Sequence, residues 1–403
     1  MTLSVRQFEA EGFRSLRQIA YPMSQLDVLV GVNGVGKSNL YRALELLRSA
    51  AANTLATDLA DEGGLESALW AGVHRKSAPR RISLAVEFAP SDASASTYRY
   101  EVEVGLPVRG VSAAFEGEAQ IKSEALSYLA TARPVRLIDR NVLSVMARDE
   151  DGRPVEIDLD LLPSETVLGR LEDPSRHPEL DAVRRTLLQW RFYHGLRTDA
   201  DSPLRRPCAP VATPSLASDG SNLAAVFATL AHIRQDTVDL DEAVERAFPG
   251  ARLVVPAPGR AASFGMTFPE FPQRLFEARE LSDGTLRFLA LAGALLAYRL
   301  PPFIALNEPE ASLHPDLMEP LAGLIGQAAK RTQVWLVTHS NRLADAVTAT
   351  GAGKVRTVVK TGGETRIERL KRWGAFEDED DPRCAAPCRR RVKAGAATRL
   401  RNA

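Results

Sequence analysis

The segment GVNGVGKSN, residues 31–39, contains the pattern Gly31-x-x-x-x-Gly36-Lys37-Ser38. Glycines allow backbone N–H groups to curl around phosphates, a lysine neutralises β- and γ-phosphate oxygens, and a serine hydroxyl can bind Mg²⁺. A glycine-rich turn can match this pattern by chance. The apolar run before the segment and the amphipathic stretch after it favour nucleotide binding.

A second segment, ALNEPEASLHP at residues 305–315, directly follows the apolar residues 302–304. Hydrolysis at a phosphate-binding loop needs a carboxylate at the end of a neighbouring strand to orient and deprotonate water, and Glu308 fits that place. Asn307 stands where a metal-holding carboxylate is usual. Its carbonyl can accept a hydrogen bond from a Mg²⁺-bound water, but without the charge that hard cations favour. Glu310 is either part of this site or a solvated turn residue.

The segment VTHSN, residues 337–341, places His339 just after a third apolar run. A single histidine is most often structural. Its position at a strand end, beside the other two junctions, favours a functional role.

The segment LSDGT, residues 281–285, precedes an apolar helix predicted over 286–298. A Ser-Asp-Gly helix start offers free N–H groups, a hydroxyl and the positive end of the helix dipole, which together form an anion site. The alternative is a simple helix cap. The same triplet at residues 218–220 precedes a helix predicted over 222–234, and we expect that copy to be only a cap, since it lies far from the 303–308 strand.

Three short runs are apolar on both faces, at residues 26–30, 303–306 and 334–337, and Asp27 is the one polar residue among them. Unbroken apolar strands are typical of a parallel sheet covered by helices on both faces. Ligands of such α/β sheets gather at the carboxyl ends of the strands. The three polar junctions should therefore meet at one edge of one sheet.

Bulk composition limits the classes of function. The chain has 403 residues, 45% of them hydrophobic and 25% charged, which is enough for two packed units. Its 51 basic and 51 acidic residues balance, so no global field attracts nucleic acid or membrane. The start has no signal-like segment, and the apolar stretch 288–298 is too short to span a bilayer, so we expect a cytoplasmic protein. Cys384 and Cys388 are not backed by a second pair that would make a zinc site.

Together, GVNGVGKSN, LSDGT, NEPE followed by SLHP, and VTHS resemble the ATPase heads of the ABC superfamily, in particular the RecF/SMC-like branch of compact AAA-type ATPases. The resemblance covers roughly residues 1–90 and 270–370. It implies an α/β P-loop NTPase fold with a mainly parallel central sheet, an antiparallel β part and an inserted subdomain. It also implies Mg²⁺ with ATP as substrate, and a homodimer in which two heads sandwich two ATP molecules.

The resemblance further implies roles for individual residues. Ser282, Asp283 and Gly284 would act in trans on the γ-phosphate bound by the partner. His339 would sense that phosphate beside the catalytic Glu308, while Ser38 and Asn307 would face the metal. The family also has a glutamine-bearing loop, but residues 65–81 contain no glutamine, so that role stays unassigned. The ATP-binding set would be Arg14, Gly31, Asn33, Gly34, Gly36, Lys37, Ser38 and Asn39.

We expect the chain to divide into an N-terminal half-head (1–90), an insert (91–275), a C-terminal half-head (276–372) and a disordered charged tail (373–403). The insert lacks the heptads of coiled-coil arms. An Asp151-Gly152 pair predicts a hairpin, and apolar positions 180, 183, 187 and 190 predict a helix. The insert should therefore be a compact lid, β followed by α.

These features predict an ATP-hydrolysing switch that acts in DNA repair and recombination or in defence against foreign DNA. Basic clusters at 74–76 with 80–81, and at 205–206, either meet a phosphate backbone or are solvated charge. One alternative is a non-hydrolysing nucleotide sensor that recruits an effector or nuclease partner. Another is the nucleotide-binding subunit of a transporter, which the absent glutamine loop and the large insert disfavour.

Overall fold

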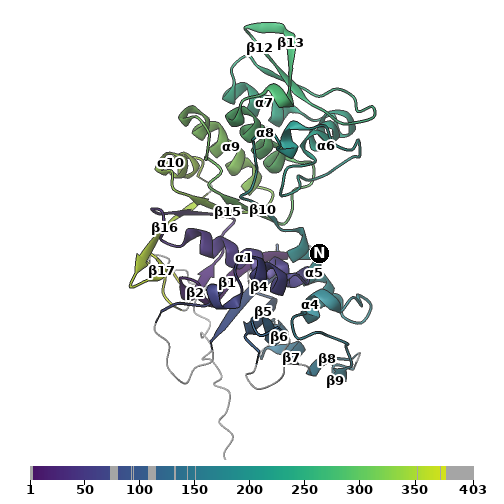
Figure 1. Ribbon diagram of the computed structural model, residues 1–403, viewed down its shortest axis with the longest axis vertical. Coiled ribbons are helices and arrows are strands. Elements are labelled where there is room, and N and C mark those ends of the chain that lie inside the picture. The colour runs from purple at the N-terminus through teal and green to yellow at the C-terminus, as the bar shows by residue number, and fades with distance from the viewer. Residues whose placement is uncertain are drawn as a thin grey trace, which may run out of the picture.

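The computed structural model describes residues 3–72, 80–91, 93, 95–107, 115–130, 133–142, 144–149, 151–351, 353–372 and 374–377. A six-stranded, mainly parallel sheet lies at its centre (Figure 1), and only its last strand is antiparallel to its neighbour. The three apolar runs are adjacent strands of this sheet, as predicted from their apolar residues on both faces. In spatial order the strands are β10 (Arg191–Tyr193), β14 (Phe303–Asn307), β15 (Gln333–Thr338), β3 (Leu26–Val30), β16 (Lys354–Thr361) and β17 (Glu364–Ile367).

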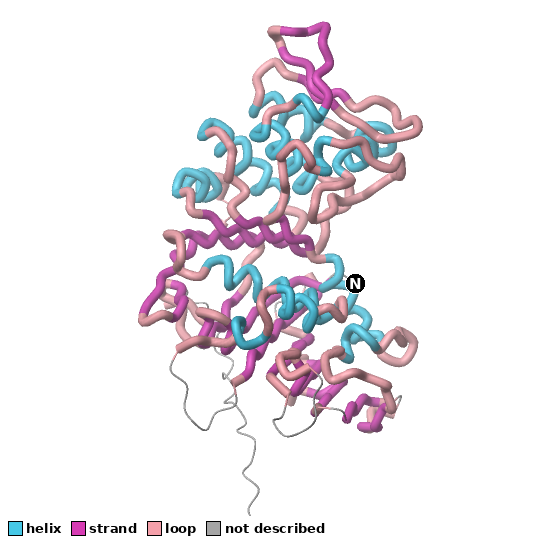
Figure 2. Tube along the Cα trace, viewed as in Figure 1, coloured by secondary structure: helices cyan, strands magenta, loops and turns pink. Residues whose placement is uncertain are grey.

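Two hydrophobic cores cover the two faces of the parallel sheet. Successive residues alternate between them: Leu29 and Trp335 belong to one core, and Val28 and Leu336 to the other. Helix α1 (Lys37–Ala51) packs in the first core, whereas α8 (Asp283–Leu296), α9 (Met318–Ala329) and α10 (Asn341–Ala349) pack in the second. Figure 2 shows the strands as a layer between α1 and these three helices. Both faces are buried, which explains why the strands carry no polar alternation.

An eight-stranded antiparallel sheet lies beyond α1 (Figure 1) and confirms the antiparallel β part. β4 and β5 pair along their length, so the predicted boundary at residue 90 falls between two hydrogen-bonded strands of one sheet. The first half-head and the insert therefore share a sheet. Its order is β2 (Leu16–Pro22), β1 (Leu3–Phe13), β4 (Arg81–Pro90), β5 (Tyr98–Gly105), β6 (Gln120–Tyr128), β7 (Val135–Asn141), β8 (Ser144–Arg148) and β9 (Pro154–Ile157).

The hairpin predicted at Asp151-Gly152 is confirmed, because β8 and β9 pair around it and Gly152 has a φ of 75°. The helix predicted from apolar positions 180, 183, 187 and 190 is α5 (Pro178–Gln189). The first three lie in the helix and Trp190 is its C-cap residue, and all four are buried in the first core. Three shorter helices complete this part of the chain: α2 (Leu55–Asp61), α3 (Leu65–Ala68) and α4 (Val167–Arg170).

The second part of the insert packs on the same face of the parallel sheet as α8, α9 and α10. It ends in a three-stranded antiparallel sheet (Figure 1). No helix of the described residues is long and apolar enough to cross a membrane. The basic cluster 74–76, both cysteines 384 and 388, and tail residues 378–403 lie outside the described part. The elements here are η1 (Pro203–Arg205), α6 (Leu223–Ala228), η2 (Thr229–Arg234), α7 (Val238–Ala247), β11 (Arg252–Val254), β12 (Gly265–Phe268), β13 (Phe271–Glu277), η3 (Ala278–Glu280) and, after β14, η4 (Pro315–Leu317).

Candidate functional site

The glycine-rich loop joins β3 to α1 at the carboxyl edge of the parallel sheet. Gly34 and Gly36 have φ values of 83° and 99°, a region that side chains other than glycine rarely adopt. A Cβ on Gly36 would lie 1.9 Å from Thr365 Oγ1 and 2.6 Å from Ser15 Oγ. Glycine is thus required at position 36 by both conformation and space. Asn33 and Ser38 are exposed at the loop surface.

Lys37 is buried beneath this loop, with 4% of its surface exposed. Its ammonium group donates hydrogen bonds to the carbonyls of Gly31 and, at 3.1 Å, Val32. Burial lowers the pKa of Lys37, and the nearby carboxylates of Glu308 and Glu310 oppose that shift. The lysine of the loop therefore shares one electrostatic environment with the two carboxylates of the ALNEPEASLHP segment.

A chain of hydroxyl groups fixes the loop from behind. The Asn39 amide donates to Ser15 Oγ at 2.6 Å, and Ser15 Oγ lies 2.6 Å from Thr365 Oγ1. Thr365 Oγ1 in turn donates to the Val35 carbonyl at 2.7 Å. Asn39, predicted to bind ATP, thus contacts the β1–β2 turn. Sequence reasoning missed Ser15 and Thr365, since nothing in the sequence links positions that are 350 residues apart.

Arg14 lies in the same β1–β2 turn, with a φ of 48°. Its guanidinium forms an ion pair with Glu62, Nη2 to Oε2 at 2.7 Å. Glu62 also pairs with Arg42 of α1. Arg14, predicted to approach the phosphates, is therefore held beside the loop by a carboxylate just beyond α2.

Asn307 and Glu308 stand at the end of β14, next to the end of β15. The N–H of Glu308 donates to the Val337 carbonyl at 2.8 Å, and its φ of 48° turns the chain sharply away from the strand. The Glu308 side chain is 37% exposed, and its Oε1 lies 3.8 Å from His339 Nδ1. Asn307 Oδ1 is buried and has no hydrogen-bond partner among the described residues. The structure thus brings Glu308 and His339 together, as predicted.

Glu310 belongs to this site, so the alternative of a solvated turn residue is wrong. It is only 7% exposed. Its Oε1 accepts hydrogen bonds from the Thr338 hydroxyl and, at 3.2 Å, from the His339 N–H, and it lies 3.3 Å from His339 Nδ1. Oε2 is buried with no hydrogen-bond partner within the described part of the chain. Glu310 therefore links the β14 turn to the segment that carries His339.

Ser282 caps α8, since its Oγ accepts a hydrogen bond from the Thr285 N–H at 3.2 Å. Asp283 is exposed and forms an ion pair with Arg205, Nη2 to Oδ1 at 2.6 Å. A Cβ on Gly284 would lie 3.1 Å from the Ser312 carbonyl oxygen. The LSDGT segment thus starts a 14-residue helix close to the turn that follows Glu308.

Arg287, one turn into α8, connects the two segments directly. It donates hydrogen bonds to the carbonyl oxygens of Glu308 at 3.2 Å and Pro309 at 3.3 Å. Its pKa is lowered by burial, against the attraction of the Glu310 charge. Sequence reasoning missed this residue, although an arginine inside the apolar run LRFLALAGALL was a visible signal.

The second Ser-Asp-Gly copy, at residues 218–220, was predicted to cap a helix, and this prediction is wrong. Helix α6 begins later, at Leu223, and its N-cap residue is Asn222. Gly220 instead has a φ of 76° inside a turn. The prediction failed because the helix starts beyond the triplet.

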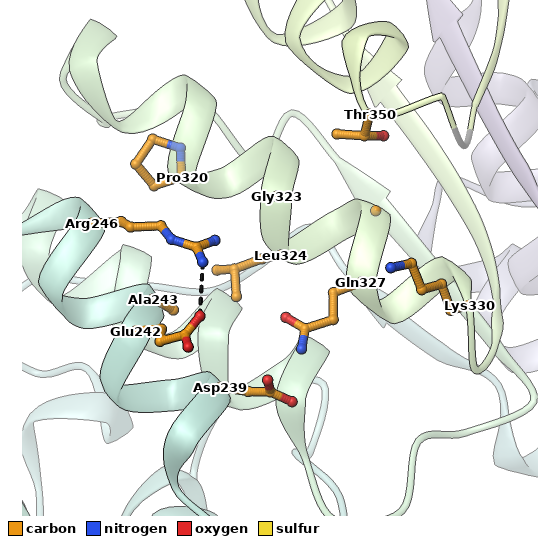
Figure 3. A pocket seen from close by; sticks show the side chains of 11 residues that line it. Asp239, Glu242, Ala243, Arg246, Pro320, Gly323, Leu324, Gln327, Lys330 and Thr350 are labelled. Carbon is orange, nitrogen blue, oxygen red and sulfur yellow. Dashed lines mark hydrogen bonds and ion pairs between the residues drawn. The ribbon is translucent and has the colours of Figure 1, made fainter.

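A hollow of about 270 Å³ lies between α7 and α9, with Thr350 at its margin (Figure 3). The ion pair between Glu242 and Arg246, 2.7 Å long, forms one wall. None of the site residues predicted from the sequence lines it. The candidate site is therefore the sheet edge and not this hollow.

A family model described as "AAA domain, putative AbiEii toxin, Type IV TA system" matches residues 28–345. No curated protein matched the sequence. A solved Smc head bound to the C-terminal winged-helix domain of ScpA has a TM-score of 0.52 and 17% identity over 90% of this chain and 97% of that chain. An Smc head with a coiled coil and joint from Pyrococcus yayanosii has a TM-score of 0.49 and 14% identity over 92% and 97%. The Smc head domain from Thermotoga maritima has a TM-score of 0.45 and 15% identity over 91% and 99%. At these identities the likeness to the first structure concerns the fold.

Proposed function

This chain belongs to the family of AAA domains described as putative AbiEii toxin of a type IV toxin–antitoxin system, and we propose that it is an ATP-hydrolysing switch whose heads dimerise around ATP. One observation carries the proposal. Lys37 of the glycine-rich loop shares its electrostatic environment with Glu308 and Glu310, and both carboxylates lie beside His339. A phosphate-binding cation and a partly exposed carboxylate at one sheet edge are groups that hydrolysis of a nucleoside triphosphate uses, and the histidine beside them can donate a hydrogen bond to the γ-phosphate.

Binding would begin at the loop. Its backbone N–H groups and the N-terminus of α1 would surround the phosphates. The Lys37 ammonium, which donates to the carbonyls of Gly31 and Val32, would exchange these partners for β- and γ-phosphate oxygens. That exchange replaces neutral acceptors with charged ones, which make stronger hydrogen bonds.

Glu308 would act as the general base. Its exposed carboxylate accepts the proton of the water that attacks the γ-phosphorus, and the bond from that phosphorus to the β-bridging oxygen breaks. His339 would donate a hydrogen bond to the γ-phosphate. Glu310 would orient His339, because it contacts both the backbone N–H and Nδ1 of that residue.

A magnesium ion fits the donor set at this edge. Asn307 Oδ1 and Glu310 Oε2 are buried oxygens without a hydrogen-bond partner among the described residues, and Ser38 is exposed. Magnesium in such sites is commonly held by one or two protein groups together with substrate phosphates. Such an ion would neutralise phosphate charge. We propose that Ser38 and Asn307 face it, and that the neutral Asn307 weakens its binding.

The LSDGT segment would complete the site of a second copy. Ser282 and the first N–H groups of α8 form an exposed anion site at the positive end of a 14-residue helix. Arg287 joins this helix to the backbone of Glu308. When the partner's γ-phosphate binds one copy's LSDGT segment, α8 and Arg287 would thus transmit the change to the turn that carries Glu308 in that same copy.

The process served by this switch is defence against foreign DNA or DNA repair, through DNA or an effector protein as partner. The family description names a toxin–antitoxin system, which supports defence. A second candidate is a nucleotide sensor that binds ATP without hydrolysing it. Asn307 favours this candidate, since its amide removes a negative charge from the metal side of the site.

Phosphate release from Mg²⁺-ATP tests the proposal, with Lys37→Ala compared with Lys330→Ala, a change at an exposed lysine at the end of α9. We expect wild type and Lys330→Ala to hydrolyse ATP, chelation of Mg²⁺ to stop turnover, and Lys37→Ala to lose ATP binding. ATP-driven dimerisation without turnover at any protein concentration would favour the sensor. Undiminished ATP binding by Lys37→Ala would contradict both candidates.

A further inference from the structure

Arg205, the last residue of η1 in the insert, binds the LSDGT segment although it precedes Asp283 by 78 residues. Its side chain is only 11% exposed. Nη2 contacts Asp283 Oδ1 at 2.6 Å, Nη1 donates to the Leu281 carbonyl at 2.8 Å, and Nε donates to the Thr198 carbonyl at 2.8 Å. All three guanidinium nitrogens are therefore engaged, and two of them hold residues on either side of Ser282.

The adjacent Arg206 has a different environment. Its side chain is 63% exposed and pairs at 3.2 Å with Asp201, which is 84% exposed. An ion pair this exposed contributes little to stability. The sequence predicted one basic cluster at 205–206, meeting a phosphate backbone or solvated. The structure separates the two arginines, and only Arg206 is solvated charge.

The Arg205 contacts have an electrostatic consequence for the anion site. The Asp283 carboxylate sits in the first turn of α8, where it would repel any phosphate that approaches Ser282. The guanidinium neutralises that charge, and its planar set of donors fixes the carboxylate and the Leu281 carbonyl in one arrangement. A lysine could supply the charge but not this fixed geometry.

We propose that Arg205 is a positioning residue of the trans-acting anion site: it shapes the start of α8 so that Ser282 and the free N–H groups meet the γ-phosphate bound by the partner copy. This inference rests on the proposed head-to-head ATPase. It assigns to the insert a direct part in ATP-driven dimerisation. A movement of the insert that withdrew Arg205 would weaken the anion site without touching the copy's own glycine-rich loop.

The first test compares Arg205→Ala and Arg205→Lys with Arg206→Ala. We expect Arg205→Ala to bind ATP as the wild type does, because the loop is untouched, but to lose at least about ten-fold in turnover and in ATP-dependent dimerisation. Arg205→Lys should fall between, and Arg206→Ala should match the wild type. Thermal unfolding shows whether each variant folds, and Arg205→Lys decides the outcome if the alanine variant does not. Wild-type turnover and dimerisation by folded Arg205→Lys and Arg205→Ala would overturn the proposal.

The second test mixes two defective proteins. In a mixed dimer of Arg205→Ala and Lys37→Ala, one site combines an intact loop with an intact LSDGT segment. Turnover should recover to about one quarter of the wild-type rate, since half of randomly formed dimers are mixed and each holds one complete site. The matched mixture of Ser282→Asp with Lys37→Ala should recover equally.

The two mixtures distinguish the inference from its premise. Recovery with Ser282→Asp but not with Arg205→Ala would overturn the role of Arg205 and leave the head-to-head ATPase intact. Failure of both mixtures, while wild-type protein hydrolyses ATP, would contradict the trans arrangement itself and with it this inference.

Discussion

The two Ser-Asp-Gly segments of this chain share a sequence and differ in structure. At residues 282–284 the serine caps a 14-residue helix, and the glycine is part of that helix. At residues 218–220 the triplet forms a turn that ends before α6, which runs directly into η2, and the N-cap of α6 is Asn222 rather than a residue of the triplet. Only the first copy places its N–H groups at the positive end of a long helix dipole, so only the first can act as an anion site.

The aspartates differ in the same way. Asp219 accepts hydrogen bonds from the N–H and hydroxyl of Ser221, two residues away, which is an ordinary local turn. Asp283 is bound by Arg205 from another part of the chain. Both triplets carry the same side chains, so the helix that follows the first triplet and its long-range partner Arg205 distinguish it from the second. Substitutions at both triplets and around the proposed nucleotide site test this difference.

Glu308→Gln should cause the largest loss of ATP turnover, because it removes the proposed general base. It leaves the phosphate contact assigned to the first triplet in place, so it separates hydrolysis from that contact. Loss of the general base should lower the turnover of ATP by about 10²- to 10⁴-fold. ATP-dependent dimerisation should persist, since the substitution leaves Ser282 and Lys37 in place. Phosphate release and light scattering measure the two properties. Glu270→Gln, at the exposed β12–β13 turn, is the control and should change neither.

Ser282→Asp tests the anion site without removing the helix cap, since aspartate is as good an N-cap as serine. Its negative charge should repel the partner's γ-phosphate. We expect turnover to fall about 100-fold, the size of effect seen when one donor to a reacting oxyanion is lost. In the Glu308→Gln background it should abolish ATP-dependent dimerisation.

Ser218→Asp is the matched control for this change at the second triplet. It should leave turnover and dimerisation unchanged, because that triplet lies in a local turn and caps no helix. Equal losses from the two aspartate substitutions would show that the copies do not differ in function.

Asn307→Asp changes the proposed metal site and leaves both Ser-Asp-Gly triplets untouched. A carboxylate here should tighten Mg²⁺ binding by about ten-fold, which is the size of effect that single residues around a metal commonly have on its affinity. It should also raise the rate of ATP turnover. Titration of turnover with Mg²⁺ measures both. If neither the half-saturating Mg²⁺ concentration nor the rate changes, position 307 only ends the strand.

The glycines give the smallest expected effect, and it concerns stability. A Cβ on Gly220 would meet Leu204 Cδ2 at 2.4 Å, and its φ is 76°. Gly220→Ala should therefore cost about 1 kcal/mol or more and lower Tm by a few degrees. Gly284 lies in a helix, where alanine is favoured over glycine, and this offsets the 3.1 Å approach of an added Cβ to the Ser312 carbonyl oxygen, so Gly284→Ala should change Tm less. Thermal unfolding compares the pair; a larger loss for Gly284→Ala would contradict the assigned backbone conformations.

The parts of this fold that the sequence predicted are local. Each of the three apolar runs is a strand, because a strand that is buried on both faces does not alternate polar with apolar residues. The glycine-rich loop follows from backbone conformations that only glycine adopts easily. Long-range pairings could not be predicted in this way. The contact of Arg205 with Asp283, the burial of Glu310 against Thr338 and the pairing of β4 with β5 across residue 90 all depend on tertiary arrangement.

Two heads that share their ATP sites can hydrolyse ATP only as a dimer. The most direct measurement is ATP turnover per molecule against protein concentration, with the molecular mass recorded at each concentration and with single- or double-stranded DNA added in parallel. The account predicts that turnover per molecule rises with concentration as monomers become dimers, and that added DNA shifts this rise to lower concentration if DNA is the partner. Constant turnover per molecule by a protein that stays monomeric would contradict it.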